Sequence, residues 1–401
     1  MLLLALVRAL PAWSAAGRDS LLPRSLRRLS FLLAGFGGAV ALSALVSPSP
    51  GEGFRALLPY AYALVLIGAF GPILSRPTLG RDSAVFWGGA TSIILMSVVA
   101  VFPHVLPPDW RALAFDSGKY ALFTKYRFLL EGPTQLAVLT LSCFGILTIA
   151  RLRIRNVPLA IDACLPALLA NLILVSGSRA AAPSGLALLA AYHGVQWTQA
   201  REVTGAERRR RSGIAALSMV AVAFILCLHL VVRPNPTAQR TASGLLDVAV
   251  RVIPSLGRFV NPEPFFVEKM YDAIEVRSHM AETGWDAFTR HPILGGGPGQ
   301  VRDTRGREVH STPLAVAAEM GLVGLLALTP LAWLPIAFVV RMRRPLTERV
   351  LLLLVLAALL LPHLFHFLLR ERWTWLFVIV LLCADPERAD LLPADPAPAR
   401  L

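Results

Sequence analysis

One polar stretch, Arg277 to Gly324, decides how this chain of 401 residues is organised. It begins R-S-H-M-A-E-T-G-W-D-A-F-T-R-H-P-I-L-G-G-G-P-G-Q, ending at Gln300, and after a short basic loop it closes with H-S-T-P-L-A-V-A-A-E-M-G-L-V-G from His310. A cationic run, a glycine-rich turn and a histidine before an apolar helix follow one another here. Long polar segments between apolar runs are usually functional or disordered. We expect this one to be held against the outer face of a membrane.

The turn 295–299 holds four glycines around Pro298. Glycine adopts backbone angles that are closed to other residues, so this turn can lie close to a ligand or to another segment of backbone. A lone glycine cluster is a weak indication. It gains weight because His310 follows nearby, and because Glu319, Gly321 and Gly324 lie nine, eleven and fourteen residues beyond that histidine.

Composition places the whole chain in a membrane. Hydrophobic residues make up 55% of it and charged residues only 16%, and the mean hydropathy is +0.61. This is typical of an integral membrane protein and excludes a soluble domain. A net charge of +14 would suggest nucleic acid in a soluble protein, but here the arginines cluster in short loops, so we expect no nucleic acid partner. All four cysteines fall inside apolar runs, which supports neither a disulfide framework nor a cysteine-based metal site.

The apolar runs predict an all-α integral membrane protein with about ten transmembrane helices. Each run is near the length that crosses about 30 Å of hydrocarbon. We expect residues 1–13 to form a cytoplasmic or interfacial helix rather than a cleaved signal. The predicted parts are membrane helices in 1–232, a periplasmic catalytic loop at 233–311, further membrane helices in 312–384 and a disordered cytoplasmic tail at 385–401. The runs are 29–47, 56–75, 84–106, 134–150, 157–176, 182–197, 214–232, 313–340, 349–368 and 373–384.

Basic residues predict the orientation. Lys and Arg are retained in cytoplasmic loops, and four arginine clusters fall on alternate loops, on the side of the N-terminus: Arg76 and Arg81; Arg151, Arg153 and Arg155; Arg208–Arg211; Arg341, Arg343 and Arg344. Both termini are therefore expected to be cytoplasmic. The longer segments 107–133 and 233–311 are expected on the outer side, and aromatic residues in the second favour an ordered, partly helical loop.

The motifs around the glycine turn resemble a known family. His-Pro-x-x-Gly-x-Gly-Pro-Gly, then His-Ser and Glu-x-Gly-Leu-x-Gly-Leu, is similar to the signature region of the O-antigen ligase and polymerase family of bacterial membrane glycosyltransferases. Arg277 stands fifteen residues before Pro292, where that family carries an arginine, and Ser178–Arg179 matches its Ser-Arg pair. The family often has a tryptophan shortly after that arginine, where this chain has Met280. The resemblance implies a GT-C-like fold and a place in the bacterial inner membrane.

The resemblance implies three catalytic residues. His310 would act as general base on an acceptor hydroxyl, since a histidine accepts a proton near neutral pH. Arg179 and Arg277 would grip a diphosphate, because guanidinium groups offer a rigid fork of donors and stay charged. An arginine at membrane depth costs about 2.5–3.5 kcal/mol unless it faces a polar cavity or a partner. Arg179 could instead be an arginine that extends to the membrane interface, and it is the resemblance that favours a function.

Other residues are weaker candidates for substrate binding. Arg290 and His291 precede the glycine turn and could touch phosphate, although His291 could equally cap the turn. Lys125 and Arg127 could add cationic surface for the donor. His363 and His366 could line a cavity or sit at the membrane interface, and the sequence does not separate these alternatives. The glycines Gly295, Gly297 and Gly299 complete the predicted binding set, with a larger part in shaping the loop than in binding.

The implied reaction moves a glycan from an undecaprenyl-diphosphate-linked donor to an acceptor at the periplasmic face. The acceptor is lipid A-core in an O-antigen ligase, and another glycan in a polymerase. We expect membrane lipids as the surroundings and no metal or cofactor, because arginines can neutralise the leaving diphosphate. The alternative from another class is a small-anion transporter, which a basic outer vestibule would suit. Against a transporter, the sequence shows neither a charged pair in mid-membrane nor an internal repeat, which many transporters have.

Overall fold

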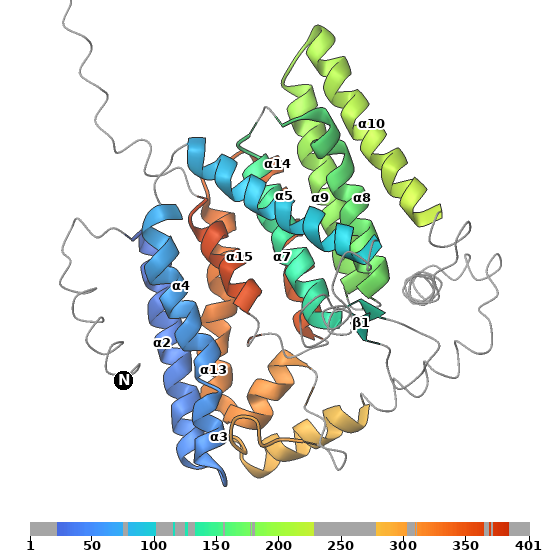
Figure 1. Cartoon of the computed structure of the whole chain (residues 1–401). Coiled ribbons are helices and arrows are strands. Elements are labelled where there is room, and N and C mark those ends of the chain that lie inside the picture. The colour runs from blue at the N-terminus through green and yellow to red at the C-terminus, as the bar shows by residue number, and fades with distance from the viewer. Residues whose placement is uncertain are drawn as a thin grey trace, which may run out of the picture.

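The computed structural model describes residues 22–74, 79–101, 115–116, 125–126, 133–154, 157–176, 178, 181–227, 278–302, 309, 311–364, 369 and 372–384. These residues form a helical bundle with one small strand pair (Figure 1). The prediction of an all-α integral membrane protein is confirmed. Our expectations for residues 1–13 and for the tail from 385 onward lie outside the described residues.

Every apolar run predicted from the sequence contains a helix. β1 (Phe115–Asp116) and β2 (Lys125–Tyr126) pair antiparallel between the helices of the third and fourth runs. The helices are α2 (Arg24–Leu45), α3 (Pro50–Arg55), α4 (Leu58–Leu74), α5 (Leu79–Val101), α7 (Pro133–Arg151), α8 (Leu159–Ser176), α9 (Ala181–Arg201), α10 (Gly205–Cys227), α13 (Thr312–Arg341), α14 (Leu346–Leu360), the 3-10 turn η4 (Leu361–Leu364) and α15 (Arg372–Leu382). Residues 278–290 are also helical.

Seven helical segments of the described part are long and apolar enough to cross a membrane. The other three predicted spans are α7, α9 and α15. The apolar part of α7 is shorter than the seven, α15 has only 11 residues, and α9 carries several polar side chains. A count of about ten spans therefore stays a prediction. The seven segments are Arg24–Leu45, Pro50–Leu74, Asp82–Ala100, Leu159–Ser176, Gly205–Cys227, Thr312–Arg341 and Leu346–Leu364.

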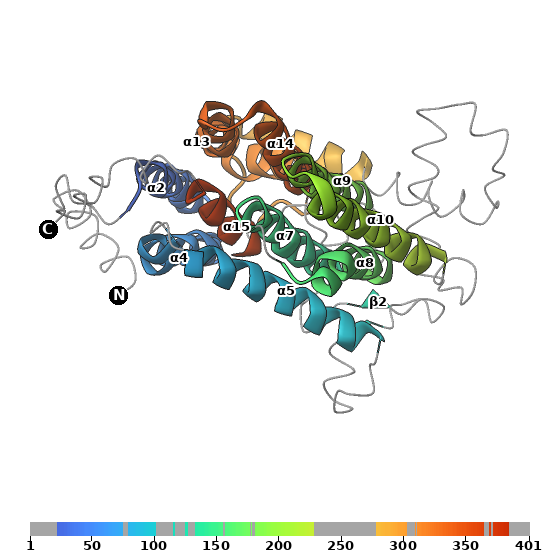
Figure 2. The same cartoon turned by 90° about the horizontal axis from the view of Figure 1, so that it is seen from above.

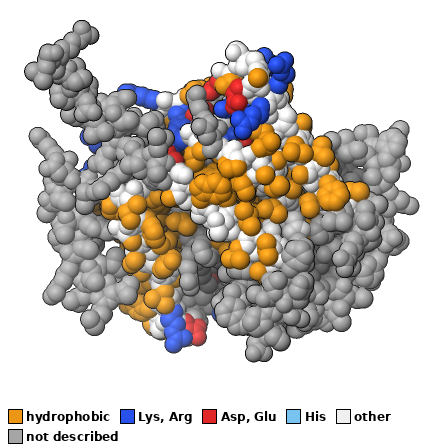
Figure 3. Space-filling model, turned by 45° about the horizontal axis from the view of Figure 1, so that its top comes forward, with side chains coloured by type: hydrophobic (Ala, Val, Ile, Leu, Met, Phe, Trp, Pro, Cys, Tyr) orange, Lys and Arg blue, Asp and Glu red, His pale blue; other side chains and the backbone are white. Residues whose placement is uncertain are grey.

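The core of the bundle surrounds α7. Seen from above, α7 stands in the middle, with α5, α8, α9 and α15 around it (Figure 2). Its side chains are almost all buried, and the ring of Phe144 packs against Tyr192 of α9 at a centroid distance of 5.0 Å. Hydrophobic side chains also cover much of the described surface, with charged side chains toward its ends (Figure 3). Such a surface is expected of helices that face lipid.

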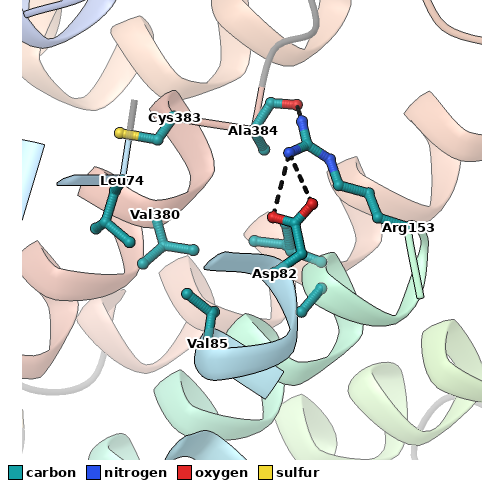
Figure 4. A pocket seen from close by; sticks show the side chains of 9 residues that line it. Leu74, Asp82, Val85, Arg153, Val380, Cys383 and Ala384 are labelled. Carbon is teal, nitrogen blue, oxygen red and sulfur yellow. Dashed lines mark hydrogen bonds and ion pairs between the residues drawn. The ribbon is translucent and has the colours of Figure 1, made fainter. Parts of the chain in front are cut away.

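One end of the bundle holds the α7–α8, α9–α10 and α13–α14 connections with their described arginines, and we call it the basic end. Arg153 pairs with Asp82 at 3.3 Å and also donates to the carbonyl of Ala384 (Figure 4). Arg344 donates to the same carbonyl at 3.1 Å. These two arginines, from the α7–α8 and α13–α14 connections, thus donate hydrogen bonds to a carbonyl just beyond the C-terminal end of α15. Cations interact favourably with the helix dipole at such an end. The helices run alternately up and down, so the opposite end, which we call the distal end, holds the α2–α3 and α8–α9 connections and the start of α13.

A buried polar network joins α7, α8 and α9 near the basic end. Arg151 donates to both carboxylate oxygens of Asp162, at 3.0 and 2.9 Å, and also to Gln199. The hydroxyl of Tyr192 donates to Asp162 at 2.6 Å. Because both charges are paired in a bidentate arrangement and the carboxylate has a further donor, the network can stay charged inside the bundle.

This network gives a first prediction. We expect Tyr192→Phe to lower the free energy of unfolding by about 1 kcal/mol, because one hydrogen bond to the buried Asp162 carboxylate is lost. The midpoint of thermal unfolding in detergent measures it. Ser97→Ala is the control, since the buried Ser97 hydroxyl has no hydrogen-bond partner among the described residues. Equal midpoints for Tyr192→Phe and the unmodified protein would show that the network does not stabilise the fold.

Candidate functional site

The glycine turn closes on a break in α13. Gly321 has φ 61° and ψ −155°, which interrupts α13 and separates 312–320 from 322–341. The sequence predicted a span at 313–340, and Thr312–Arg341 is long and apolar enough to cross a membrane, but the helix within it is interrupted at this residue. The break removes helical hydrogen bonds from the neighbouring backbone, and such groups need other partners when they are buried.

The turn supplies those partners. The amide N–H groups of Gly296 and Gly297 donate to the carbonyls of Ala318 at 2.8 Å and Glu319 at 3.0 Å. In return, the N–H groups beyond the break, from Leu322 and Val323, donate to the carbonyls of residues 292 and 293 at 2.8 and 3.2 Å. We call these interlocked segments, 291–297 and 318–323, the joint. It explains why the glycine turn and the Glu-x-Gly motif occur together in the sequence.

Two glycines, Gly295 and Gly321, allow the backbone of the turn to lie against the backbone of α13. A Cβ at Gly295, where φ is +73°, would overlap the carbonyl group of Glu319, and a Cβ at Gly321 would lie 2.7 Å from the amide nitrogen of Leu294. Backbone this close leaves no room for a side chain. The sequence allowed the turn to lie near a ligand or near backbone, and at Gly295 it lies near backbone. Gly299 also has positive φ, but nothing lies within 4 Å of its Cβ position.

The first helices of the chain support the joint at the distal end. The hydroxyl of Ser43, near the end of α2, donates to the carbonyl of Glu319 at 2.5 Å. A Cβ at Gly297 would lie 2.6 Å from Cβ of Ser47, and the side chain of Gln300 donates to Glu52 of α3 at 3.0 Å. Sequence reasoning missed this support. The small residues Ser43 and Ser47 within an apolar run are the only pattern that could have indicated it.

The helical residues 278–290 pack on the first half of α13. In Figure 1 this helix lies across the lower, distal end of the bundle. A Cβ at Gly284 would lie 3.1 Å from side-chain atoms of Val309 and Leu314, so these two side chains pack directly on the backbone of the helix. Val309 also belongs to a small apolar cluster with Val301, Ala315 and Ala318. One cluster therefore links the helix that follows Arg277 to the residues that flank position 310.

The joint and the helix at 278–290 lie within a range that matches a known protein family. Residues 164–329 match the family model described as O-antigen ligase. The chain contains an O-antigen ligase domain. None of the curated proteins compared with the chain gave a match. The matched range extends from α8 to the second half of α13, and it includes the joint, the helix at 278–290 and the positions of the three predicted catalytic residues. The chain is thus a multi-pass membrane protein and a glycosyltransferase-like enzyme of glycan ligation or polymerisation.

The predicted catalytic residues of the ligase domain, Arg179, Arg277 and His310, lie outside the described residues, as does Arg127. Lys125 is described only as a backbone residue of β2. Their meeting in space stays a prediction. Their described neighbours do lie at the distal end: Ser178 stands between α8 and α9, and Ser311 precedes α13.

Arg290 and His291 are exposed; Arg290 comes directly before the joint, and His291 is its first residue. Arg290 ends the helix at 278–290, and the amide of His291 still donates to the carbonyl of Ala287 at 3.1 Å. The first glycine of the turn, Gly295, donates its N–H to the carbonyl of His291 at 2.9 Å. The backbone of His291 thus closes the turn, as one of the two sequence hypotheses expected, while both side chains remain accessible to a ligand.

Two buried residues at the distal end, Glu319 and His363, are further candidates for the functional site. Glu319 is 3% exposed and occupies the first half of α13. An acidic residue inside an apolar run is costly in a membrane and marks a functional site. The sequence itself contains this indication, because Glu319 lies inside the apolar run 313–340. His363 of η4 is also buried, and its Nε2 has no hydrogen-bond partner within the described part of the chain. Its burial favours the interior of the bundle over the lipid surface. His366 lies outside the described residues.

Among the described residues, no group of three or more His, Cys, Asp or Glu side chains could hold a metal ion.

Proposed function

We propose that this protein transfers a glycan from an undecaprenyl-diphosphate-linked donor to lipid A-core at the periplasmic face of the bacterial inner membrane, as an O-antigen ligase. The observation that carries the proposal is the match of residues 164–329 to the O-antigen ligase family. That range contains the joint, whose two segments lie on either side of His310 in the sequence. Positive charge at the basic end supports a cytoplasmic location of that end, and hence of both termini.

In this proposal the reaction is a direct substitution at the anomeric carbon of the donor. His310 accepts the proton of the acceptor hydroxyl, whose oxygen then forms the new glycosidic bond. The bond between the anomeric carbon and the diphosphate breaks, and the electron pair remains on the diphosphate. Arg179 and Arg277 stabilise the charge that builds there, since preorganised cations contribute most in a site that excludes water.

The exposed residues next to the joint bind the substrate in this proposal. Arg290 and His291 offer donors to phosphate or sugar oxygens, and Lys125 and Arg127 add positive charge from the segment around β2. Gly295, Gly297 and Gly299 set the path of the turn that carries them. The charge on the diphosphate is neutralised by arginine, so the proposed chemistry uses no metal and no cofactor.

The proposal assigns a different role to each part of the chain. Helices in 1–232 and 312–384 form the membrane domain, and the segment 233–311 carries catalytic residues on the periplasmic side. The joint connects the two parts, because its turn comes from the periplasmic segment and its broken helix from the membrane domain.

The test is transfer by the purified protein in detergent. A diphosphate-linked lipid oligosaccharide is supplied with and without lipid A-core, and product size is followed on gels. One shift of lipid A-core by the size of the oligosaccharide is the expected result. A ladder formed from the donor alone would identify a polymerase instead. No transfer to either acceptor, by protein that is shown to be folded, would contradict the proposal and favour an anion transporter.

A further inference from the structure

The helix at 278–290 presents three different faces. Met280 and Gly284 lie on its buried face, against the first half of α13. A second face, at i, i+4 and i+7, holds Ala281, Trp285 and Phe288. Trp285 is 57% exposed, and its ring lies 5.6 Å from that of Phe288. The third face is polar, with His279, Glu282, Asp286 and Arg290, all of them exposed.

The loop that follows this helix continues a surface that faces lipid. Ile293 is 66% exposed, although its carbonyl accepts a hydrogen bond from Val323, in the second half of α13. On that half, Leu322 is exposed and Leu326 is 73% exposed. Thr312–Arg341 is apolar enough to span a membrane, so Leu326 has lipid as its surroundings. Ile293 extends the same apolar surface beyond the span.

We propose that Trp285, Phe288, Ile293 and Leu322 form an interfacial ridge that dips into the headgroup layer at the distal end. Lipid is the occupant that fits, because the ridge is continuous with the lipid-facing surface of α13. Tryptophan is enriched at this depth, where an apolar ring and its N–H meet both surroundings. The polar face of the same helix turns toward water, as in helices that lie in the plane of a membrane.

The ridge has a consequence for the site. Arg290 and His291 stand between Phe288 and Ile293 in the chain, so the ridge sets their depth close to that of lipid phosphates. If the proposed function holds, the joint presents these side chains at the level of a polyprenyl diphosphate, and the donor need not leave the membrane. The lipid contact itself does not depend on the proposed function.

The test measures where single nitroxide labels lie in reconstituted vesicles. The four native cysteines are replaced, and one cysteine is introduced at position 285, 293, 326, 282 or 286. Power saturation compares the accessibility of each label to oxygen, which concentrates in lipid, and to a water-soluble nickel chelate. We expect labels at 285 and 293 to resemble the lipid reference at 326. Labels at 282 and 286 on the polar face should show a several-fold higher ratio of nickel to oxygen accessibility.

Three outcomes would overturn the ridge. Labels at 285 and 293 that resemble those at 282 and 286 would place the segment in water. Labels shielded from both reagents would mean that another protein surface covers it. Shielding that appears only when oligosaccharide is added would mean that the face binds glycan.

A second measurement keeps the native cysteines. The tryptophan fluorescence of the unmodified protein minus that of Trp285→Phe reports Trp285 alone. Lipids brominated near the glycerol should quench this difference signal strongly, while iodide in the water should quench it weakly. The reverse order would contradict the proposal.

Discussion

Gly321→Ala should abolish glycan transfer and destabilise the protein by about 2–4 kcal/mol. An alanine at φ 61° is strained by about 1 kcal/mol, and its Cβ would overlap the backbone of Ile293 and lie 2.7 Å from the amide nitrogen of Leu294. Neither neighbour can move without breaking the hydrogen bonds that close the joint, so overpacking adds about 1–3 kcal/mol or more. Transfer rate and the midpoint of thermal unfolding in detergent measure the two effects.

Gly299→Ala is the matched control for this prediction. Gly299 also has positive φ, at 76°, but its Cβ position is open. Gly299→Ala should therefore cost about 1 kcal/mol and leave most of the transfer activity. Gly295→Ala, which also meets backbone, should behave like Gly321→Ala. If alanine at 299 and at 321 had equal effects, positive φ alone would explain them, and the close approach of the two backbones would be irrelevant.

His310→Ala should lower the rate of transfer by a factor of about 10²–10⁴, the usual contribution of a positioned general base. Under the proposed mechanism the acceptor hydroxyl then has no group to take its proton. The loss should appear in the rate at saturating donor, with the thermal unfolding midpoint unchanged. Arg277→Ala should weaken donor binding as well, because it removes a cation from the diphosphate.

His279→Ala provides the control for the histidine. His279 is exposed on the polar face of the helix at 278–290 and has no part in the proposed mechanism, so its loss should leave the rate unchanged. Transfer by His310→Ala at the rate of His279→Ala, with both proteins folded, would remove the histidine from the mechanism and leave the family assignment intact.

The helices could be predicted from the sequence because hydrophobic periods and basic loops extend over many residues. The break at Gly321 could not, since one positive φ leaves the hydropathy of its run unchanged. Its indication was indirect, because only the fold shows that Gly295 lies against the backbone of Glu319 and that Gly321 lies against the backbone of Ile293. Arg151 is similar. It counts as a loop charge in the sequence, but it lies buried on Asp162, which is itself inside an apolar run.

The candidate site could be predicted only in part, for a related reason. The motif order pointed to the segment 277–324, which holds the two halves of the joint. The support from α2 and α3 is distant in sequence and uses ordinary serines, so no local pattern marks it. The interfacial ridge also needs the structure, because exposure of Trp285 and Ile293 depends on which face of the helix packs on α13.

The central claim is that the lipid-linked donor binds at the distal end, beside the joint. A polyprenyl diphosphate that carries a photoreactive group near the diphosphate tests it most directly, when labelled peptides of the reconstituted protein are identified by mass spectrometry. The account predicts labels in 285–297, in 309–320 and around Ser178, and competition by unmodified donor. Labels confined to the basic end, at 151–157 or 341–349, would contradict it.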